Sequence, residues 1–133
     1  MEKKWWHHLT AYQIYTRSFC DSNGDGIGDF QGIISKLDYL QELGIGAIWI
    51  SPFNDSPNYD NGYDISDYYA ILKDFGTMAD LEEMIQECEK RDIIVMMDLV
   101  LNHCSHEHPW FLGACKDRNG KYHDYYIWEE GTE

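Results

Sequence analysis

Two almost entirely apolar runs, each preceded by an amphipathic segment, constrain the fold of this chain most. Residues 45–50 read IGAIWI and residues 93–97 read IIVMM. Strands that are apolar on both faces are typical of parallel sheets covered by helices. Residues 11–16 (AYQIYT) are short, aromatic and β-branched, so they predict a third strand. We therefore expect a parallel sheet that contains at least these three strands.

The segments between these strands have helical periodicity. From Asp29 onward, apolar residues recur at helical spacing up to Leu43, and Gly44 follows as a stop signal. This predicts one amphipathic helix over 29–43. Thr77 and Asp80 form a capping box for a second helix that extends to about Cys88. The alternation of strands and helices predicts an α/β fold with right-handed crossovers.

The pattern is that of an incomplete domain. Three parallel strands leave both edges of a sheet unpaired, which is unfavourable for an isolated chain. Residues 51–69 form a long polar and aromatic connection, and the tail over 102–133 is polar, with 124–128 (DYYIW) as a possible strand. At 133 residues the chain fits one small domain or a piece of a larger one.

Charge and composition exclude several classes of partner. The formal net charge of −14 argues against nucleic acid, since few cations are present to neutralise phosphates. No apolar run reaches the roughly 18–20 residues that span a membrane, and residues 1–15 lack the apolar core of a signal peptide. The cysteines (Cys20, Cys88, Cys104 and Cys115) form no C-x-x-C pair, so we expect reduced thiols and a cytoplasmic protein.

An acidic loop over 21–29 (DSNGDGIGD) follows the first predicted strand. Oxygen-bearing side chains alternate there with glycines, which suits a hard cation such as Ca²⁺. The pattern begins like an EF-hand loop, but that loop ends with Glu at position twelve, and Gly32 stands there. The loop therefore binds metal in another framework or does not bind metal.

Polar side chains follow the second and third strands. Asp60, Tyr63 and Asp64 come after one strand, and Asp98 and His103 come after the other. Functional groups of parallel α/β folds collect at this end of the strands. Carboxylates, an imidazole and an aromatic ring on one rim suit a sugar ligand.

Each of these residues also has a structural interpretation. Asp60 could shape a turn, Tyr63 could pack in the core, Asp98 could cap a loop and His103 could be a structural histidine. His106 and His108 lack an evident third metal ligand, so we interpret them as solvated loop residues.

Three stretches resemble a known family. They are AYQIYTRSFCDSNGDGIGDFQGI, IGAIWISPFNDSPNYDNGYDISDY and DLVLNHCSHEHPWF. In order and spacing they resemble the start of bacterial α-glucosidases of the α-amylase superfamily, glycoside hydrolase family 13. The nearest group contains oligo-1,6-glucosidase, dextran glucosidase and trehalose-6-phosphate hydrolase, and the resemblance covers essentially the whole chain.

This resemblance implies a (β/α)₈ TIM barrel of which the chain supplies the first three βα units. Residues 1–104 would be the N-terminal part of the catalytic barrel. Residues 105–133 would begin the inserted domain B. The remainder of the barrel would complete the fold.

The resemblance also implies roles for individual residues. His103 would hydrogen-bond the glucose in the −1 subsite, Asp98 would brace the floor, Asp60 would hold glucose hydroxyls and Tyr63 would stack beneath the ring. A structural Ca²⁺, away from the reacting sugar, would be bound by the family's calcium loop. Its ligands would be the side chains of Asp21, Asn23, Asp25 and Asp29 and the carbonyl of Ile27. Cys104 and Phe53 depart slightly from the family's commoner residues.

The residues that would perform the reaction are missing from this sequence. Retaining glycosidases use two carboxyl groups about 5–5.5 Å apart. The family places its nucleophile in a G-x-R-x-D motif, its acid on a later Glu and a third carboxylate in an N-H-D motif, and none occurs here. The resemblance therefore implies an inactive N-terminal segment of an exo-acting α-glucosidase, with the catalytic residues beyond Glu133. The substrate would be an oligosaccharide with a non-reducing α-linked glucose.

Other functions stay open. The chain could be a non-catalytic calcium- or sugar-binding module, or part of a transglucosylase or sucrose isomerase. A third alternative, the non-catalytic ectodomain of amino-acid transporter subunits, is disfavoured because the sequence has no membrane anchor and contains His103 and Tyr63. Bond specificity would depend on later loops.

Overall fold

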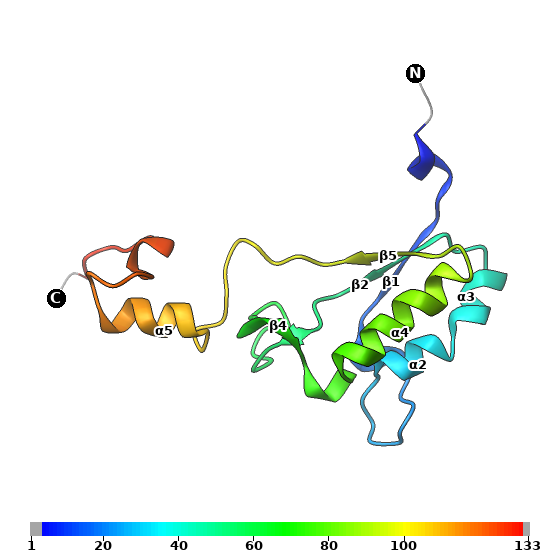
Figure 1. Ribbon diagram of the computed structural model, residues 1–133, viewed down its shortest axis with the longest axis horizontal. Coiled ribbons are helices and arrows are strands. Elements are labelled where there is room, and N and C mark those ends of the chain that lie inside the picture. The colour runs from blue at the N-terminus through cyan, green and yellow to red at the C-terminus, as the bar shows by residue number, and fades with distance from the viewer. Residues whose placement is uncertain (1–3, 132–133) are drawn as a thin grey trace.

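The computed structural model describes residues 4–131, and its centre is a parallel sheet of three strands. The strands are β1 (Ala11–Ile14), β2 (Ala47–Ile50) and β5 (Ile94–Met97), in the order β1-β2-β5 (Figure 1). Ile14 lies level with Ile50, which lies level with Met97. The three predicted strands and their parallel arrangement are confirmed.

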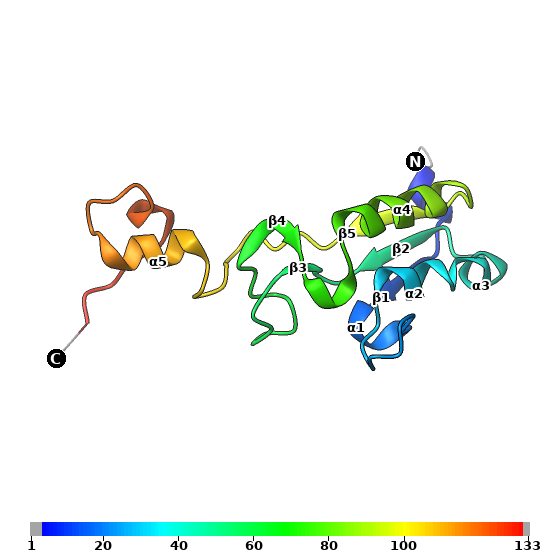
Figure 2. The same cartoon turned by 60° about the horizontal axis from the view of Figure 1, so that its bottom comes forward.

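Three helices cover one face of this sheet. They are α2 (Phe30–Ile34), α3 (Leu37–Glu42) and α4 (Met78–Glu89), and α2 packs against α4 (Figures 1 and 2). The core lies between helices and sheet. Its fully buried members include Ile14, Phe30, Ile33, Leu37, Leu40, Ile48, Ile50, Met84 and Cys88. Burial of this apolar area is the main stabilising term.

The opposite face of the sheet is open in the described part of the chain. Trp49 is 38% exposed and lies level with Met96, which is 40% exposed. We expected both faces of these apolar strands to be covered, and that expectation is wrong for residues 4–131. The open face and the two unpaired edges are those of a sheet that continues in a larger fold.

The helix predicted over 29–43 is two helices. The Ser35 hydroxyl donates to the carbonyl of Gly32 at 2.7 Å, and the N–H of Lys36 instead reaches Ile33 at 2.9 Å. A serine that bonds the preceding turn competes with the regular ladder, and Lys36 leaves the helical region with φ −109° and ψ 1°. Gly44, with φ 82°, ends α3 as predicted.

The capping box of α4 is confirmed. The Thr77 hydroxyl accepts from the Asp80 N–H at 3.3 Å, and the Asp80 carboxylate accepts from the Thr77 N–H at 2.7 Å. These two bonds satisfy N–H groups that a helix start leaves without partners. The helix ends at Glu89, one residue after the position expected from the apolar pattern.

The connection over 51–69 contains structure that the sequence did not predict. β3 (Asn54–Asp55) pairs antiparallel with β4 (Asp67–Ile71), with a register irregularity at Asn54 and Asp55. A short helix α1 (Thr16–Phe19) follows β1, and 3-10 turns occur at Trp5–His8 and Lys73–Phe75.

Residues 105–131 lie to one side of the sheet and are joined to it by an extended segment (Figure 1). They contain α5 (Pro109–Lys116) and the 3-10 helix η3 (His123–Tyr125). The strand expected over 124–128 is wrong, because Tyr126 and Trp128 pack on Phe111 of α5, with ring centroids 5.2 and 6.1 Å away. The division into a barrel part (1–104) and the start of an inserted domain (105–133) stays a prediction. Residues 1–3 and 132–133, at the two ends of these predicted parts, lie outside the described residues.

Among residues 4–131, no helix combines the length and apolar character needed to cross a membrane. All four cysteines are free thiols in this part of the chain. Cys88 lies on the buried face of α4, and burial raises the pKa of its thiol to about 11.

Candidate functional site

The site forms where the strands of the sheet end. Ser51 directly follows β2 and its N–H bonds Ile14, while Asp98 directly follows β5 and its N–H bonds Ile50. The sheet ladder therefore continues through both residues. It brings polar side chains that are far apart in sequence to one edge of the sheet.

Tyr63 and Asp98 are joined across this edge. The Tyr63 hydroxyl donates to the Asp98 carboxylate at 2.9 Å. Burial, followed by the hydrogen bond to Asp98, raises the pKa of Tyr63 above its usual value of 10. The phenol therefore remains a proton donor, and the ring is held at a fixed angle over the strand ends.

A buried carboxylate shapes the loop that carries Asp60. Asp64 accepts hydrogen bonds from the Ser56 hydroxyl at 2.9 Å and from the N–H groups of Tyr59 and Asp60 at 2.9 and 3.0 Å. Burial alone would raise the pKa of Asp64, but these hydrogen bonds outweigh it and hold the pKa below its usual value. The Tyr63 N–H closes the turn on the Asp60 carbonyl at 3.0 Å.

His103 contacts the same loop. Its Nε2 lies 3.1 Å from the Tyr63 carbonyl, and its Nδ1 lies 3.1 Å from the Asn102 side-chain amide nitrogen. A carbonyl only accepts and an amide nitrogen only donates, so Nε2 carries the proton and Nδ1 is the acceptor. The ring is exposed at the rim of the site.

The three residues predicted to bind sugar and Asp98, predicted to brace the floor of the site, are thus brought together. Asp60 and Tyr63 share one tight turn, Tyr63 bonds Asp98 and His103 bonds Tyr63. The sequence interpretation did not assign a role to Asp64 or include Ser51. The signal for Asp64 was an acidic residue at the end of an Asn-Gly turn, where a short acceptor satisfies backbone N–H groups.

The acidic loop over 21–29 is ordered by its own carboxylates. Asp21 accepts from the N–H groups of Gly24 and Gly26, each at 2.7 Å, and of Asn23 at 3.0 Å. These backbone bonds, with those of Gly24 and Gly26 the largest, lower the pKa of Asp21. Asp29 caps α2 by accepting from the Gly32 N–H at 2.6 Å.

The oxygen atoms of this loop are of the type that binds Ca²⁺, but the loop does not direct them toward a common point. Asn23 accepts from the Asp25 N–H at 2.9 Å, and Asp25 accepts from the Ile27 N–H at 2.8 Å. Within residues 4–131, no three Asp, Glu, His or Cys side chains converge as metal ligands. The residues therefore fit a calcium site in chemical type only, and calcium stays a prediction.

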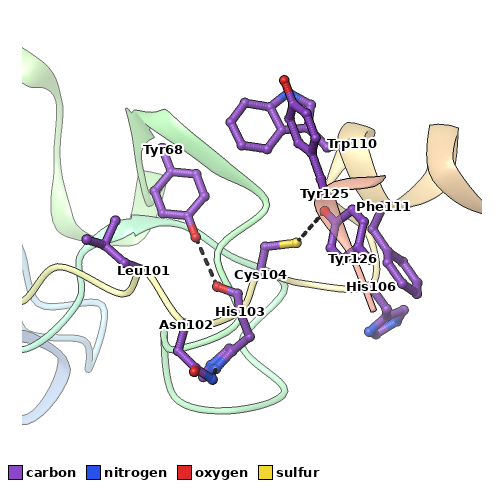
Figure 3. A pocket seen from close by; sticks show the side chains of 10 residues that line it. All are labelled: Tyr68, Leu101, Asn102, His103, Cys104, His106, Trp110, Phe111, Tyr125 and Tyr126. Atoms are coloured by element: carbon purple, nitrogen blue, oxygen red, sulfur yellow. Dashed lines mark hydrogen bonds between the residues drawn. The ribbon is translucent and has the colours of Figure 1, made fainter. Parts of the chain in front are cut away.

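A cavity of about 520 Å³ lies beside the His103 segment (Figure 3). One side is formed by residues 101–104 and Tyr68, and the other by aromatic rings of the α5 region. These rings belong to Trp110, Phe111, Tyr125 and Tyr126. The two sides meet at the Cys104 thiol and the Tyr126 hydroxyl, with 3.0 Å between sulfur and oxygen.

His108 is buried, so its interpretation as a solvated loop residue is wrong, whereas His106 is exposed as expected. The His108 Nδ1 accepts from the Trp110 N–H at 3.0 Å and caps α5. Its ring packs against both Trp110 and Tyr68, at centroid distances of 4.7 and 5.7 Å. The capping hydrogen bond and the contacts with the two aromatic rings explain why this histidine is buried.

We expect His108 to make the folded chain acid-sensitive. Burial lowers the pKa of His108 below its ordinary value of 6.5, with Asp67 acting in the opposite direction. The unfolded chain then binds the proton more readily, so stability is full above pH 6.5 and falls as the pH drops toward the folded pKa. In His108→Asn, which keeps a capping acceptor, melting temperatures should depend less on pH in this window than in His106→Asn. Equal pH profiles for the two variants would contradict this.

Comparison with known proteins places the fold. Residues 13–133 match the model of the alpha amylase catalytic domain. The chain is 61% identical over its full length to oligo-1,6-glucosidase from Bacillus cereus, of which it covers 24%. All of it superposes on 24% of isomaltulose synthase from Klebsiella sp. LX3, with a TM-score of 0.97 and 53% identity. For trehalose-6-phosphate hydrolase from Bacillus licheniformis, 98% of the chain superposes on 23% of that structure, with a TM-score of 0.94 and 52% identity.

The chain therefore spans about a quarter of the length of these relatives. The parallel strands and their helices are part of a (β/α)₈ barrel, and the open sheet face is the part of the barrel wall that faces its interior. The predicted resemblance is confirmed. The chain belongs to the family of alpha amylase catalytic domains.

Proposed function

We propose that this chain is the N-terminal, sugar-binding part of a retaining exo-acting α-glucosidase that resembles oligo-1,6-glucosidase. The observation that carries the proposal is the linked cluster of Asp60, Tyr63, Asp98 and His103 at the strand ends. The 61% identity to an oligo-1,6-glucosidase supports the reaction type.

The proposed roles follow from the contacts. The Tyr63 ring, fixed by Asp98, offers an apolar face to a pyranose. The Asp60 carboxylate projects from a turn braced by Asp64 and accepts from glucose hydroxyls. His103 donates from Nε2 when a sugar oxygen replaces the Tyr63 carbonyl. The nucleophile and the general acid are proposed to lie outside these 133 residues.

The proposal is tested with the purified enzyme that contains this chain. We expect glucose release from isomaltose and short α-1,6-linked oligosaccharides, and no hydrolysis by residues 1–133 alone, which lack the two carboxyl groups of the reaction. A full-length enzyme inactive on every α-glucoside would contradict the proposal, as would genuine hydrolysis by the isolated chain.

Sucrose isomerisation is a second candidate. The superposition on isomaltulose synthase is at least as good as that on the hydrolase, so the fold of these residues fits both activities. Sucrose in the same substrate panel separates them. An isomerase converts it to another disaccharide, whereas a hydrolase releases glucose.

We also propose a cytoplasmic location and a structural Ca²⁺ on the acidic loop. Free thiols at all four cysteines support the first, and the alternating oxygen side chains of Asp21, Asn23 and Asp25 support the second.

A bound cation should raise the thermal stability of the enzyme, because a ligand that binds only the folded form stabilises it. We expect a higher melting temperature with millimolar Ca²⁺ than with EDTA, and a smaller difference in Asp25→Asn. The substitution removes a charge but keeps an acceptor for the Ile27 N–H. Identical melting curves in Ca²⁺ and EDTA would reject the metal, and the loop would then be ordered by its hydrogen bonds alone.

A further inference from the structure

The segment over 99–104 carries His103, yet its backbone makes no hydrogen bond to another part of the backbone in the described structure. Its flanks are fixed by the Asp98 N–H on Ile50 at 3.2 Å and by the Ser105 N–H on Ile65 at 2.8 Å. Side chains hold it at two points, where Val100 is buried and where the Cys104 sulfur lies 3.0 Å from the Tyr126 hydroxyl, whereas Leu101 is 78% exposed. The position of His103 must therefore depend on a contact from another element.

Tyr68 of β4 makes that contact. Its hydroxyl lies 2.9 Å from the Val100 carbonyl and 3.0 Å from the His103 carbonyl (Figure 3 shows the second). A phenol has one proton, so the two carbonyls share it. Burial raises the pKa of Tyr68, which keeps the hydroxyl protonated. In the described part of the chain, no other hydrogen bond reaches the backbone of 99–104.

Tyr68 is itself held firmly. Its carbonyl accepts from the Asn54 side chain on β3 at 2.9 Å. Its ring stacks on Trp110 at 6.4 Å between centroids and packs against His108 at 5.7 Å. The Tyr68 hydroxyl therefore has a fixed position, and its hydrogen bonds to Val100 and His103 determine where the backbone of 99–104 lies.

We propose that Tyr68 is a positioning residue for His103, acting through the backbone of 99–104 and never touching the sugar. While the Tyr68 hydroxyl bonds the segment, the His103 ring keeps its hydrogen bond from Nε2–H to the Tyr63 carbonyl. Without it, the segment gains torsional freedom and the imidazole samples other orientations. The consequence for catalysis rests on the proposed function, whereas the consequence for the ring does not.

The test compares Tyr68→Phe with Tyr69→Phe. Tyr69 is the adjacent residue, is 86% exposed, and its hydroxyl makes no hydrogen bond in the described structure. Each substitution removes one hydroxyl and keeps the ring. In the enzyme that contains this chain, we expect Tyr68→Phe to lower kcat about tenfold, as loss of alignment does. KM should change far less, and Tyr69→Phe should change neither.

A second measurement reads the His103 ring directly. In ¹⁵N spectra of the histidine-labelled enzyme that contains this chain, His103 should show the Nε2–H tautomer in the unsubstituted protein and in Tyr69→Phe. In Tyr68→Phe its two nitrogen shifts should move toward the tautomer average. Unchanged His103 shifts in Tyr68→Phe would overturn the proposal, as would a loss of kcat that only follows a loss of folded protein in melting curves. An inactive unsubstituted enzyme would reject the proposed function instead, and the spectra would still decide the role of Tyr68.

Discussion

Replacing His103 by alanine should lower kcat/KM of the enzyme that contains this chain about 100-fold, the usual effect of removing one preorganised donor at a reacting sugar. The Nε2–H of His103 lies at the rim of the site, beside the turn that carries Asp60 and Tyr63. A donor placed there stabilises charge that develops on the sugar during the reaction. Stability should hardly change, because the ring is exposed.

The matched control is His8→Ala. His8 is also exposed and lies in the 3-10 turn Trp5–His8, before β1. Initial rates on isomaltose and melting temperatures of both variants check the prediction. Rates for His103→Ala within a few-fold of those for His8→Ala would remove His103 from the sugar site.

Replacing Gly32 by alanine should be among the most damaging changes to stability. A Cβ at this position would lie 1.8 Å from the Cys20 carbonyl oxygen, which belongs to the backbone and cannot rotate away. Gly32 is buried in α2, and its N–H bonds the cap residue Asp29. The helix must therefore move away from the Cys20 backbone, and we expect a loss of about 3 kcal/mol or more in the free energy of unfolding.

Substitutions at two other glycines serve as controls that distinguish this steric clash from the general effect of replacing glycine by alanine. A Cβ on Gly131 would meet nothing within 4 Å, so Gly131→Ala should be nearly neutral. Gly24 has equally open space but a φ of 86°, so Gly24→Ala should cost about 1 kcal/mol through backbone strain. Urea denaturation of the three variants checks this order. Equal midpoints for Gly32→Ala and Gly131→Ala would contradict it.

The sequence predicted the parallel sheet because its signals are local and strong. The apolar run over 45–50 and the capping box of Thr77 and Asp80 each specify an element without reference to the rest of the chain. The break at Ser35 and Lys36 was missed because periodicity alone cannot show that a serine hydroxyl will take a helix carbonyl.

The structure of residues 105–131 was predicted less well. Pro109 at the start of α5 is a usual helix signal, but the cap is His108, which is outside the common capping residues. Residues 124–128 have strand-like composition, yet their aromatic rings pack on α5 and pair with no neighbouring strand. Tertiary packing decided both cases.

The sequence predicted which residues form the site but not which of them contact one another. Resemblance to the family selected Asp60, Tyr63, Asp98 and His103, and the structure confirms that they are close together. Their connections could not be read from sequence, because Tyr63 and Asp98 are 35 positions apart. Tyr68 was missed for the same reason, since its partners lie on a segment that contacts it only in the fold.

The most direct test of the account is the anomeric form of the glucose that the enzyme releases from p-nitrophenyl α-glucoside, whose leaving group is not a sugar. Proton NMR during the first turnovers distinguishes α-glucose from β-glucose before mutarotation mixes them. A retaining enzyme built on this site releases α-glucose from this substrate. Release of β-glucose, or no release of glucose from any α-glucoside, would contradict the account.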